Sequence, residues 1–234
     1  MIRYAGFAGV AAGVALAVEF GLFMLSGFTP QTFADPESAI GFLRERGGYL
    51  RAAVLVGAAG AALTTVFVVG LAARLRDAAP TRAATSLYLG VVGGGGHGLV
   101  ALTFWIGIPT LVSLSANDPQ AAAAVVSSLT LLTGGAEAFG NLFLALSMAS
   151  AGSAILSSRA LPAWIGWVAL AAAAFTLTRI VATDTPLAAL AFVAFFPSLI
   201  LAVVFRIGAG IALQGSQPDE LSRPPEPVLG MAGR

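Results

Sequence analysis

Residues 4–25 read YAGFAGVAAGVALAVEFGLFML, an apolar run that contains a single charged side chain, Glu19. An α-helix rises 1.5 Å per residue, so this run is long enough to cross the hydrocarbon core of a bilayer, which is about 30 Å thick. A cleaved signal peptide is the alternative, because Arg3 precedes the run and residues 15–17, Ala-Leu-Ala, resemble a cleavage site. The apolar residues continue past Glu19, farther than a signal peptide requires. We therefore expect a first transmembrane helix here.

The apolar character of this run extends over most of the chain. Of the 234 residues, 58% are hydrophobic and only 10% are charged, whereas about a quarter of an average soluble chain is charged. The mean hydropathy is +0.90. The net charge of +1 gives no reason to expect a nucleic-acid partner. The chain has no cysteine and no lysine, which excludes disulfides, thiolate metal sites and Schiff-base chemistry. We expect a lipid bilayer to be its main surrounding.

Five further apolar runs predict five more transmembrane helices. They cover residues 49–73, 84–108, 119–156, 162–182 and 186–211. The predicted fold is therefore all-α, a polytopic membrane bundle of six transmembrane helices in one domain over residues 1–213. From residue 214 onward proline and charged residues predict a disordered tail, over residues 214–234.

A short helix is also predicted in the loop between the first and second spans. Asp35, Pro36 and Glu37 form a helix-start pattern, and Arg44, Arg46 and Gly47 form a helix-stop pattern. This loop helix lies either on the membrane surface, because its apolar side chains share one face, or in water.

The fourth predicted helix is too long for a simple span. It begins after Asp118 and Pro119, which suit the cap and first position of a helix, and only Gly134 and Gly135 interrupt it before Leu156. Its length of about 57 Å is roughly twice the hydrocarbon core. We expect either that its first turns protrude or that it kinks at the glycine pair.

The arginines predict the orientation in the membrane. Cytoplasmic loops of membrane proteins retain basic residues. The N-terminus, the loop after the second span, the loop after the fourth span and the tail hold eight of the twelve: Arg3, Arg74, Arg76, Arg82, Arg159, Arg206, Arg223 and Arg234. We therefore expect both termini in the cytoplasm, with the chain in the inner membrane of a bacterial cell.

A short motif between the fourth and fifth spans resembles that of a known family. Residues 158–166 read SRALPAWIG, preceded by Gly152 and Ile155, and the N-terminus reads Arg3-Tyr4-Ala5-Gly6. The first stretch is similar to the Ser-x-x-Leu-Pro-x-Trp-Ile/Leu-Gly signature of a bacterial family of six-helix membrane proteins, known only as a domain of unknown function. The resemblance implies a six-helix fold and no particular activity. Physically, the motif predicts a tight hairpin, in which Pro162 opens a helix and Gly166 permits close helix contact.

Ionisable residues inside the spans are the candidates for function, because burying them in a membrane costs several kcal/mol unless they are paired or hydrated. Counted from the expected cytoplasmic end of each helix, four of them lie about 20 to 29 Å up, in the outer half. With the amide one turn from Glu137, the candidate site comprises Glu19, His97, Glu137, Asn141 and Arg179. Arg206 is placed at the cytoplasmic boundary instead, where its side chain should reach into the headgroups.

These residues leave several kinds of site open. They either bind a small ligand or a proton, or only hold the helices together, with Arg179 paired to Glu137 or Asp184 and Glu19 bonded to His97. His97, the only histidine, could hold a metal with Glu19 and Glu137, but no motif supports this, and no metal or cofactor is predicted. The glycines at 93–96 lack the pattern of a phosphate loop and should let a neighbouring helix approach or loosen their own helix. No nucleophile, base and oxyanion donor can be assigned together, so no catalytic residue is named.

The working hypothesis for function is binding or transport of a small polar or amphiphilic ligand, a small molecule or a lipid, in the outer half of the bundle. A structural or accessory membrane protein without a ligand is the first alternative, and a membrane-embedded enzyme is the second. The sequence predicts neither the identity of the ligand nor the oligomeric state.

The orientation can be tested with reporter fusions. A green fluorescent protein fused after Arg234 should fluoresce, because it folds in the cytoplasm, and alkaline phosphatase inserted at Asp184 should be active, because it needs the outer side. Activity of the phosphatase after Arg234 instead would contradict the predicted orientation.

Overall fold

A computed structural model describes residues 2–27, 36–183 and 185–215 of the chain. These residues form helices and connecting turns, without a strand, which confirms the predicted all-α class. The helices are α1 (Ile2–Ser26), α2 (Pro36–Leu75), α3 (Pro80–Asn117), α4 (Pro119–Ser158), α5 (Ala163–Ala182) and α6 (Ala188–Gly215).

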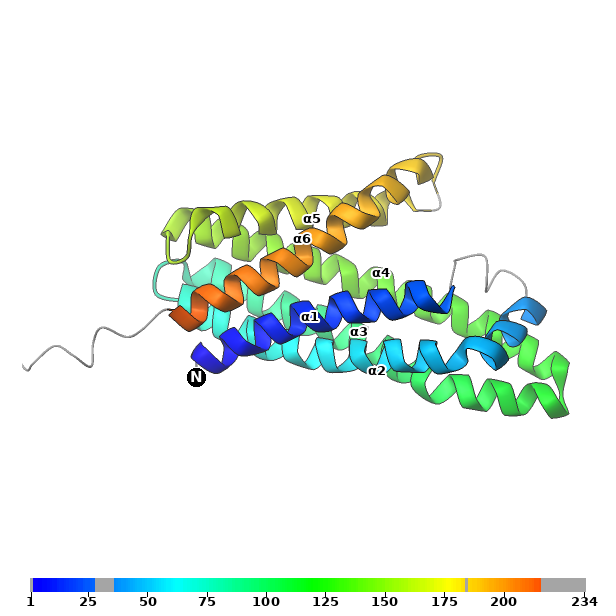
Figure 1. The fold of residues 1–234 in the computed structure, drawn as a ribbon. Helices are drawn as coiled ribbons and strands as arrows, with labels where there is room; N and C mark the ends of the chain where they lie inside the picture. Colours follow the sequence, from blue (N-terminus) through cyan, green and yellow to red (C-terminus); the bar gives the residue numbers. More distant parts are fainter. Residues whose placement is uncertain (1, 28–35, 184, 216–234) are drawn as a thin grey trace, which may run out of the picture.

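The six helices form one bundle in which each helix packs against the next along the chain, and α6 returns to α1 (Figure 1). Helix α2 also contacts α4 and α6, so it lies nearest the centre. We call the end of the bundle with Ile2, the α2–α3 and α4–α5 turns and Gly215 the terminal end, and the opposite end the distal end.

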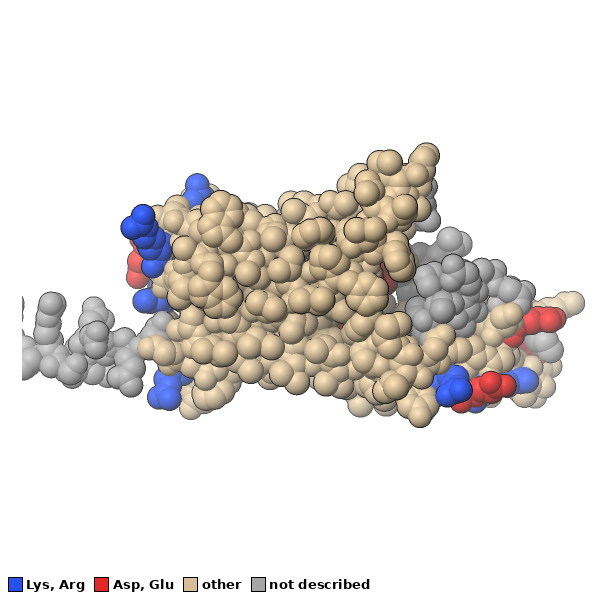
Figure 2. All heavy atoms as spheres, turned by 45° about the horizontal axis from the view of Figure 1, so that its top comes forward, with Lys and Arg blue, Asp and Glu red and all other residues tan. Residues whose placement is uncertain are grey.

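All six helices are long and apolar enough to cross a membrane, which agrees with the predicted number of spans. On the face shown in Figure 2, arginine, aspartate and glutamate atoms gather at the two ends, with a nearly uncharged belt between them. Large apolar side chains such as Val181 and Phe192 are exposed on the bundle, 70% and 73% respectively. The protein is a multi-pass membrane protein.

The predicted loop helix is helical but is not separate. Helix α2 begins at Pro36 and continues through Gly47 into the second span. Leu43 is buried against α3 and α4, and Arg44 donates a hydrogen bond of 3.1 Å to the hydroxyl of Ser115 on α3. These tertiary contacts stabilise the helical conformation at residues where the local sequence predicts the end of a helix. The expected cap, Asp35, lies outside the described residues. The first two residues of the tail predicted over 214–234 belong to α6, which ends at Gly215, and the rest of the tail lies outside the described residues.

The first turns of α4 and the last turns of α3 protrude with this part of α2 beyond the distal end of α1 (Figure 1). A separate apolar core joins them, comprising Ala39, Leu43, Leu50, Ile108, Leu111 and Val126. The start of α4 is capped as expected, since the Asp118 carboxylate accepts a hydrogen bond of 3.0 Å from the N–H of Ala121. The predicted excess length of the fourth helix therefore protrudes, and α3, which ends at Asn117 instead of residue 108, is longer than expected for the same reason.

Glycine contacts bring several helix backbones together. A Cβ added at Gly152 of α4 would lie 2.7 Å from the carbonyl oxygen of Gly166 on α5, and one added at Gly93 of α3 would lie 2.9 Å from the carbonyl oxygen of Gly140 on α4. Gly94, on another side of α3, faces Thr65 of α2. Helix α3 is continuous through residues 93–96. The glycine run therefore serves helix contact, as does Gly166 in the predicted hairpin.

Two glycines of this run allow a direct test. In Gly93→Ala the new methyl would press on backbone atoms of α4 that cannot move aside, so we expect the free energy of unfolding to fall by about 1–3 kcal/mol. Gly95 has no neighbour within 4 Å at the corresponding place, so Gly95→Ala should be neutral or raise it by up to about 1 kcal/mol through helix propensity. Thermal unfolding in detergent measures both, and equal effects would contradict the packing.

Candidate functional site

The charged residues of the spans share one property, which is that each lies on the inward face of its own helix. Seven residues are close to two helical turns, so residues seven apart share a face. Glu19 lies seven residues after buried Ala12, and Glu137 lies seven residues before buried Leu144. The same relation, at seven or four residues from a buried position, holds for His97, Arg179 and Arg206. All five side chains therefore lie on the same faces of their helices as the buried residues.

Contacts along α2 show that these residues lie at similar levels. A methyl group at Gly57 would collide with the carboxylate of Glu19, so the two are directly opposed. Four residues farther along α2, Ala61 lies opposite Gly98, the neighbour of His97. Asn141 follows Gly140, whose Cβ would lie 3.3 Å from the backbone nitrogen of His97. The helices α1, α3 and α4 thus bring their polar groups to the same short section of α2.

Arg206 belongs to this group, and its predicted position at the cytoplasmic boundary is wrong. Its carbonyl oxygen lies at the level of Gly9, well inside the bundle, because α6 continues to Gly215. Side chains on a helix lean toward the N-terminus of that helix. Since α1 and α6 are antiparallel, Glu19 and Arg206 lean toward each other, and their charges interact.

His97, Asn141 and Glu137 form a connected chain of polar side chains. Asn141 donates a hydrogen bond from Nδ2 to Oε1 of Glu137, at 3.4 Å, one turn away on α4. His97 on α3 interacts electrostatically with both Asn141 and Glu137. The imidazole therefore lies beside Asn141 and Glu137, whereas the sequence had suggested Glu19 as its partner.

Arg179 brings α5 and α6 into the same group. Its guanidinium carbon lies 5.3 Å from the centre of the Phe195 ring on α6, which is a cation–π arrangement. Its charge also interacts with Glu137 on α4. Asp184, the other predicted partner, lies outside the described residues. We call Glu19, His97, Glu137, Asn141, Arg179 and Arg206 the polar layer.

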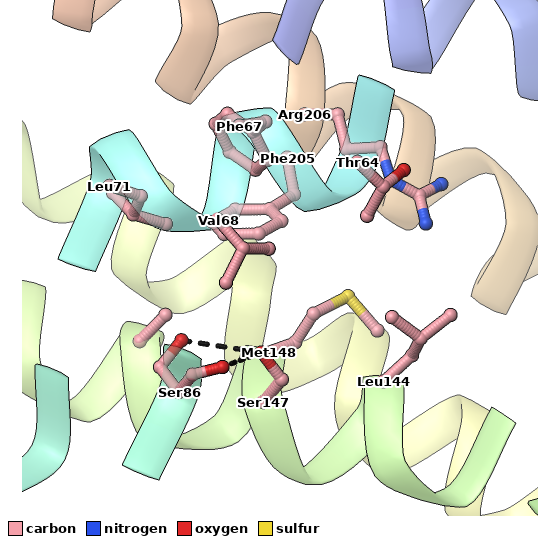
Figure 3. A pocket seen from close by; sticks show the side chains of 11 residues that line it. Thr64, Phe67, Val68, Leu71, Ser86, Leu144, Ser147, Met148, Phe205 and Arg206 are labelled. Atoms are coloured by element: carbon pink, nitrogen blue, oxygen red, sulfur yellow. Dashed lines mark hydrogen bonds between the residues drawn. The ribbon is translucent and has the colours of Figure 1, made fainter. Parts of the chain in front are cut away.

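A small cavity lies on the terminal side of the polar layer (Figure 3). It is lined by Thr64, Phe67, Val68, Leu71, Ser86, Leu144, Ser147, Met148, Ala151, Phe205 and Arg206. Its volume of about 20 Å³, counted as the space open to the centre of a water molecule, suits a single water. Ser147 donates a hydrogen bond of 2.7 Å to the carbonyl oxygen of Ser86. The sequence did not single out this cavity.

Among the residues that the structure describes, none covers the polar layer on its distal side. Glu137 is exposed although Leu144, two turns along the same face of α4, is 8% exposed. Gly134 and Gly135 have no neighbour within 4 Å at their Cβ positions. Figure 1 shows α5 and α6 turned away from α4 at the distal end. The inward face of α4 is therefore packed at Leu144 and accessible at Glu137.

The chemistry of the polar layer is that of charge and hydrogen bonding. Two carboxylates and two guanidiniums balance, and His97 and Asn141 add donors and acceptors. Among the described residues, no three of the His, Asp and Glu side chains lie close enough together to hold a metal ion. The layer can thus hold a polar or charged group of a ligand that enters from the distal side.

Comparison with protein families finds one match. A family model described as Domain of unknown function (DUF4386) matches residues 11–211. No curated protein matches the chain, and no solved structure matches it. The match reaches from α1 to α6, while the hairpin signature at residues 158–166 stays a prediction.

The electrostatic interaction between Glu19 and Arg206 can be tested by a double-mutant cycle. Removing one charge leaves the other buried and unpaired, so Arg206→Gln should lower the free energy of unfolding by about 3 kcal/mol, and Glu19→Gln should lower it less. The double variant should be at least about 1 kcal/mol more stable than the sum of the single losses predicts.

Thermal unfolding in detergent measures this cycle, with Arg76→Gln as the control, because the side chain of Arg76 is 77% exposed. Losses that simply add would show that Glu19 and Arg206 do not interact.

Proposed function

The chain belongs to the DUF4386 family of membrane proteins, whose function is unknown, and from its polar layer we propose that it binds or transports a small polar or amphiphilic ligand. One observation carries the proposal, namely that Glu137 is exposed on the inward face of an apolar helix. A carboxylate at this depth costs several kcal/mol unless water or a partner reaches it. Keeping it accessible beside His97, Asn141 and Arg179 is more than helix packing requires.

A structural role is supported for one part of the same layer. Glu19 fits against Gly57 and interacts with Arg206, and both side chains are only partly exposed. This pair joins α1, α2 and α6 and suits the role of a polar contact between helices. We therefore assign Glu19 and Arg206 to the integrity of the bundle, and Glu137, Asn141, His97 and Arg179 to the ligand.

The proposed orientation places the accessible side of the layer outside the cytoplasm. Arg3, Arg74, Arg76, Arg82 and Arg159 all lie at the terminal end of the bundle. Basic residues are retained on the cytoplasmic side of membranes. With the terminal end in the cytoplasm, a ligand would reach Glu137 from the outer half of the bilayer or from the outer solution.

Native mass spectrometry of the purified protein tests this division of roles. We expect the wild type to retain a small molecule, and Glu137→Gln to retain it at least tenfold less, which corresponds to about 1.4 kcal/mol of binding free energy. Because Glu137 is exposed, its replacement should lower the free energy of unfolding less than Arg206→Gln does, by no more than about 1.5 kcal/mol for the lost interactions with Asn141 and Arg179.

Glu45→Gln is the matched control, since Glu45 is exposed on α2 away from the layer. Equal retention by both variants would contradict a ligand site at Glu137. If a variant loses the retained molecule only when its free energy of unfolding also falls, the purely structural alternative would be supported.

A further inference from the structure

The polar layer holds its own cation at the place where a ligand would enter. The guanidinium of Arg179 lies over the face of the Phe195 ring, 5.3 Å from its centre, and its charge interacts with that of Glu137. A carboxylate together with aromatic faces is the combination that proteins use to bind organic cations, including quaternary ammonium groups. Arg179 thus marks a cation site that the protein itself fills.

The aromatic side of this site is larger than one ring. The rings of Phe20 on α1 and Phe195 on α6 have centroids 5.7 Å apart, and Phe196 lies edge-on to both, with centroids at 5.9 and 5.4 Å. Phe196 is also 43% exposed. The distal part of α6 therefore offers aromatic surface beside the guanidinium, which suits an apolar group attached to a cation.

The distribution of exposure favours a cation over an anion. Of the six members of the polar layer, Glu137 alone is exposed, whereas Arg179 and Arg206 are only partly exposed. Each arginine also interacts with a carboxylate, Arg179 with Glu137 and Arg206 with Glu19. An incoming anion would meet the Glu137 carboxylate first, while a cation would be attracted to it.

We infer that the ligand of the polar layer is an amphiphilic organic cation, whose charged group replaces the guanidinium of Arg179 on the face of the Phe195 ring and is attracted to Glu137. This inference rests on the proposed function and names its ligand class. Arg179 competes with the ligand, because its guanidinium covers the Phe195 ring in the absence of the cation and must move aside for binding. Its long side chain can do so without a change in the helices.

Titration of two probes tests the inference. The protein is placed in nanodiscs of zwitterionic lipid, and decyltrimethylammonium or decyl phosphate is titrated in calorimetrically, with empty nanodiscs as the blank. We expect the ammonium probe to bind the wild type, to bind Glu137→Gln at least tenfold more weakly, and to bind Arg179→Gln at least fivefold more tightly. The controls Glu45→Gln and Arg46→Gln make the same charge changes at exposed positions of α2 and should behave as the wild type.

Two results would overturn the inference. Preferential binding of decyl phosphate, lost in Arg179→Gln, would show an anion site and leave the proposed ligand-binding function in place. Failure of both probes to bind above the blank would contradict a site for amphiphiles, and the retained molecule in native mass spectrometry would then decide the proposed function separately. Since Glu137→Gln is expected to fold normally, its result stands even if Arg179→Gln lowers stability.

Discussion

Close contact between helix backbones is the constraint on which the arrangement of this bundle depends. In a membrane the hydrophobic effect does little to hold helices together, because lipid tails are as apolar as the side chains they replace. Packing of small residues takes over this role. Gly6 against Gly210 joins α1 to α6, Gly152 against Gly166 joins α4 to α5, and Gly93 against Gly140 joins α3 to α4. At these points a methyl group would collide with backbone atoms, so the helices are held in register.

The register then decides which polar groups meet. Because α2 holds Glu19 at Gly57 and approaches α3 at Ala61, side chains from separate helices reach one layer. Within that layer the burial is uneven. On the terminal side of the layer, Arg206 lines a cavity that suits about one water. On the distal side, Glu137 is exposed. A site that is packed on one side and accessible on the other suits a ligand that approaches from the distal side.

Much of this arrangement could be predicted from the sequence, because transmembrane helices are regular and their connections are short. Counting 1.5 Å per residue placed His97, Asn141, Glu137 and Arg179 at one depth. In the structure Asn141 bonds Glu137, and the charge of Glu137 interacts with His97 and Arg179. The counting failed for Arg206, because α6 extends to Gly215 and the side chain leans back into the bundle.

Features that depend on contacts between helices could not be predicted. Nothing local shows that α2 continues through Gly47, since Leu43 and Arg44 are held by α3 and α4. The cavity could not be predicted from the sequence either. Hydroxyl residues are common in membrane helices and usually bond their own helix, as Thr64 does with Gly60, so the bond between Ser147 and Ser86 leaves no mark in the sequence.

The most direct test of an accessible polar layer is thiol labelling, for which the chain needs no prior engineering because it has no cysteine. Single variants Glu137→Cys, Phe139→Cys and Leu144→Cys would be treated with a charged maleimide in membrane fragments, where both faces meet the reagent. Phe139 is 51% exposed on another face of α4, which the account places in lipid, and Leu144 is buried. Since only a hydrated thiol ionises and reacts, labelling at position 137 should be at least about tenfold faster than at the other two. Equal rates at 137 and 139, or no labelling at 137, would contradict the account.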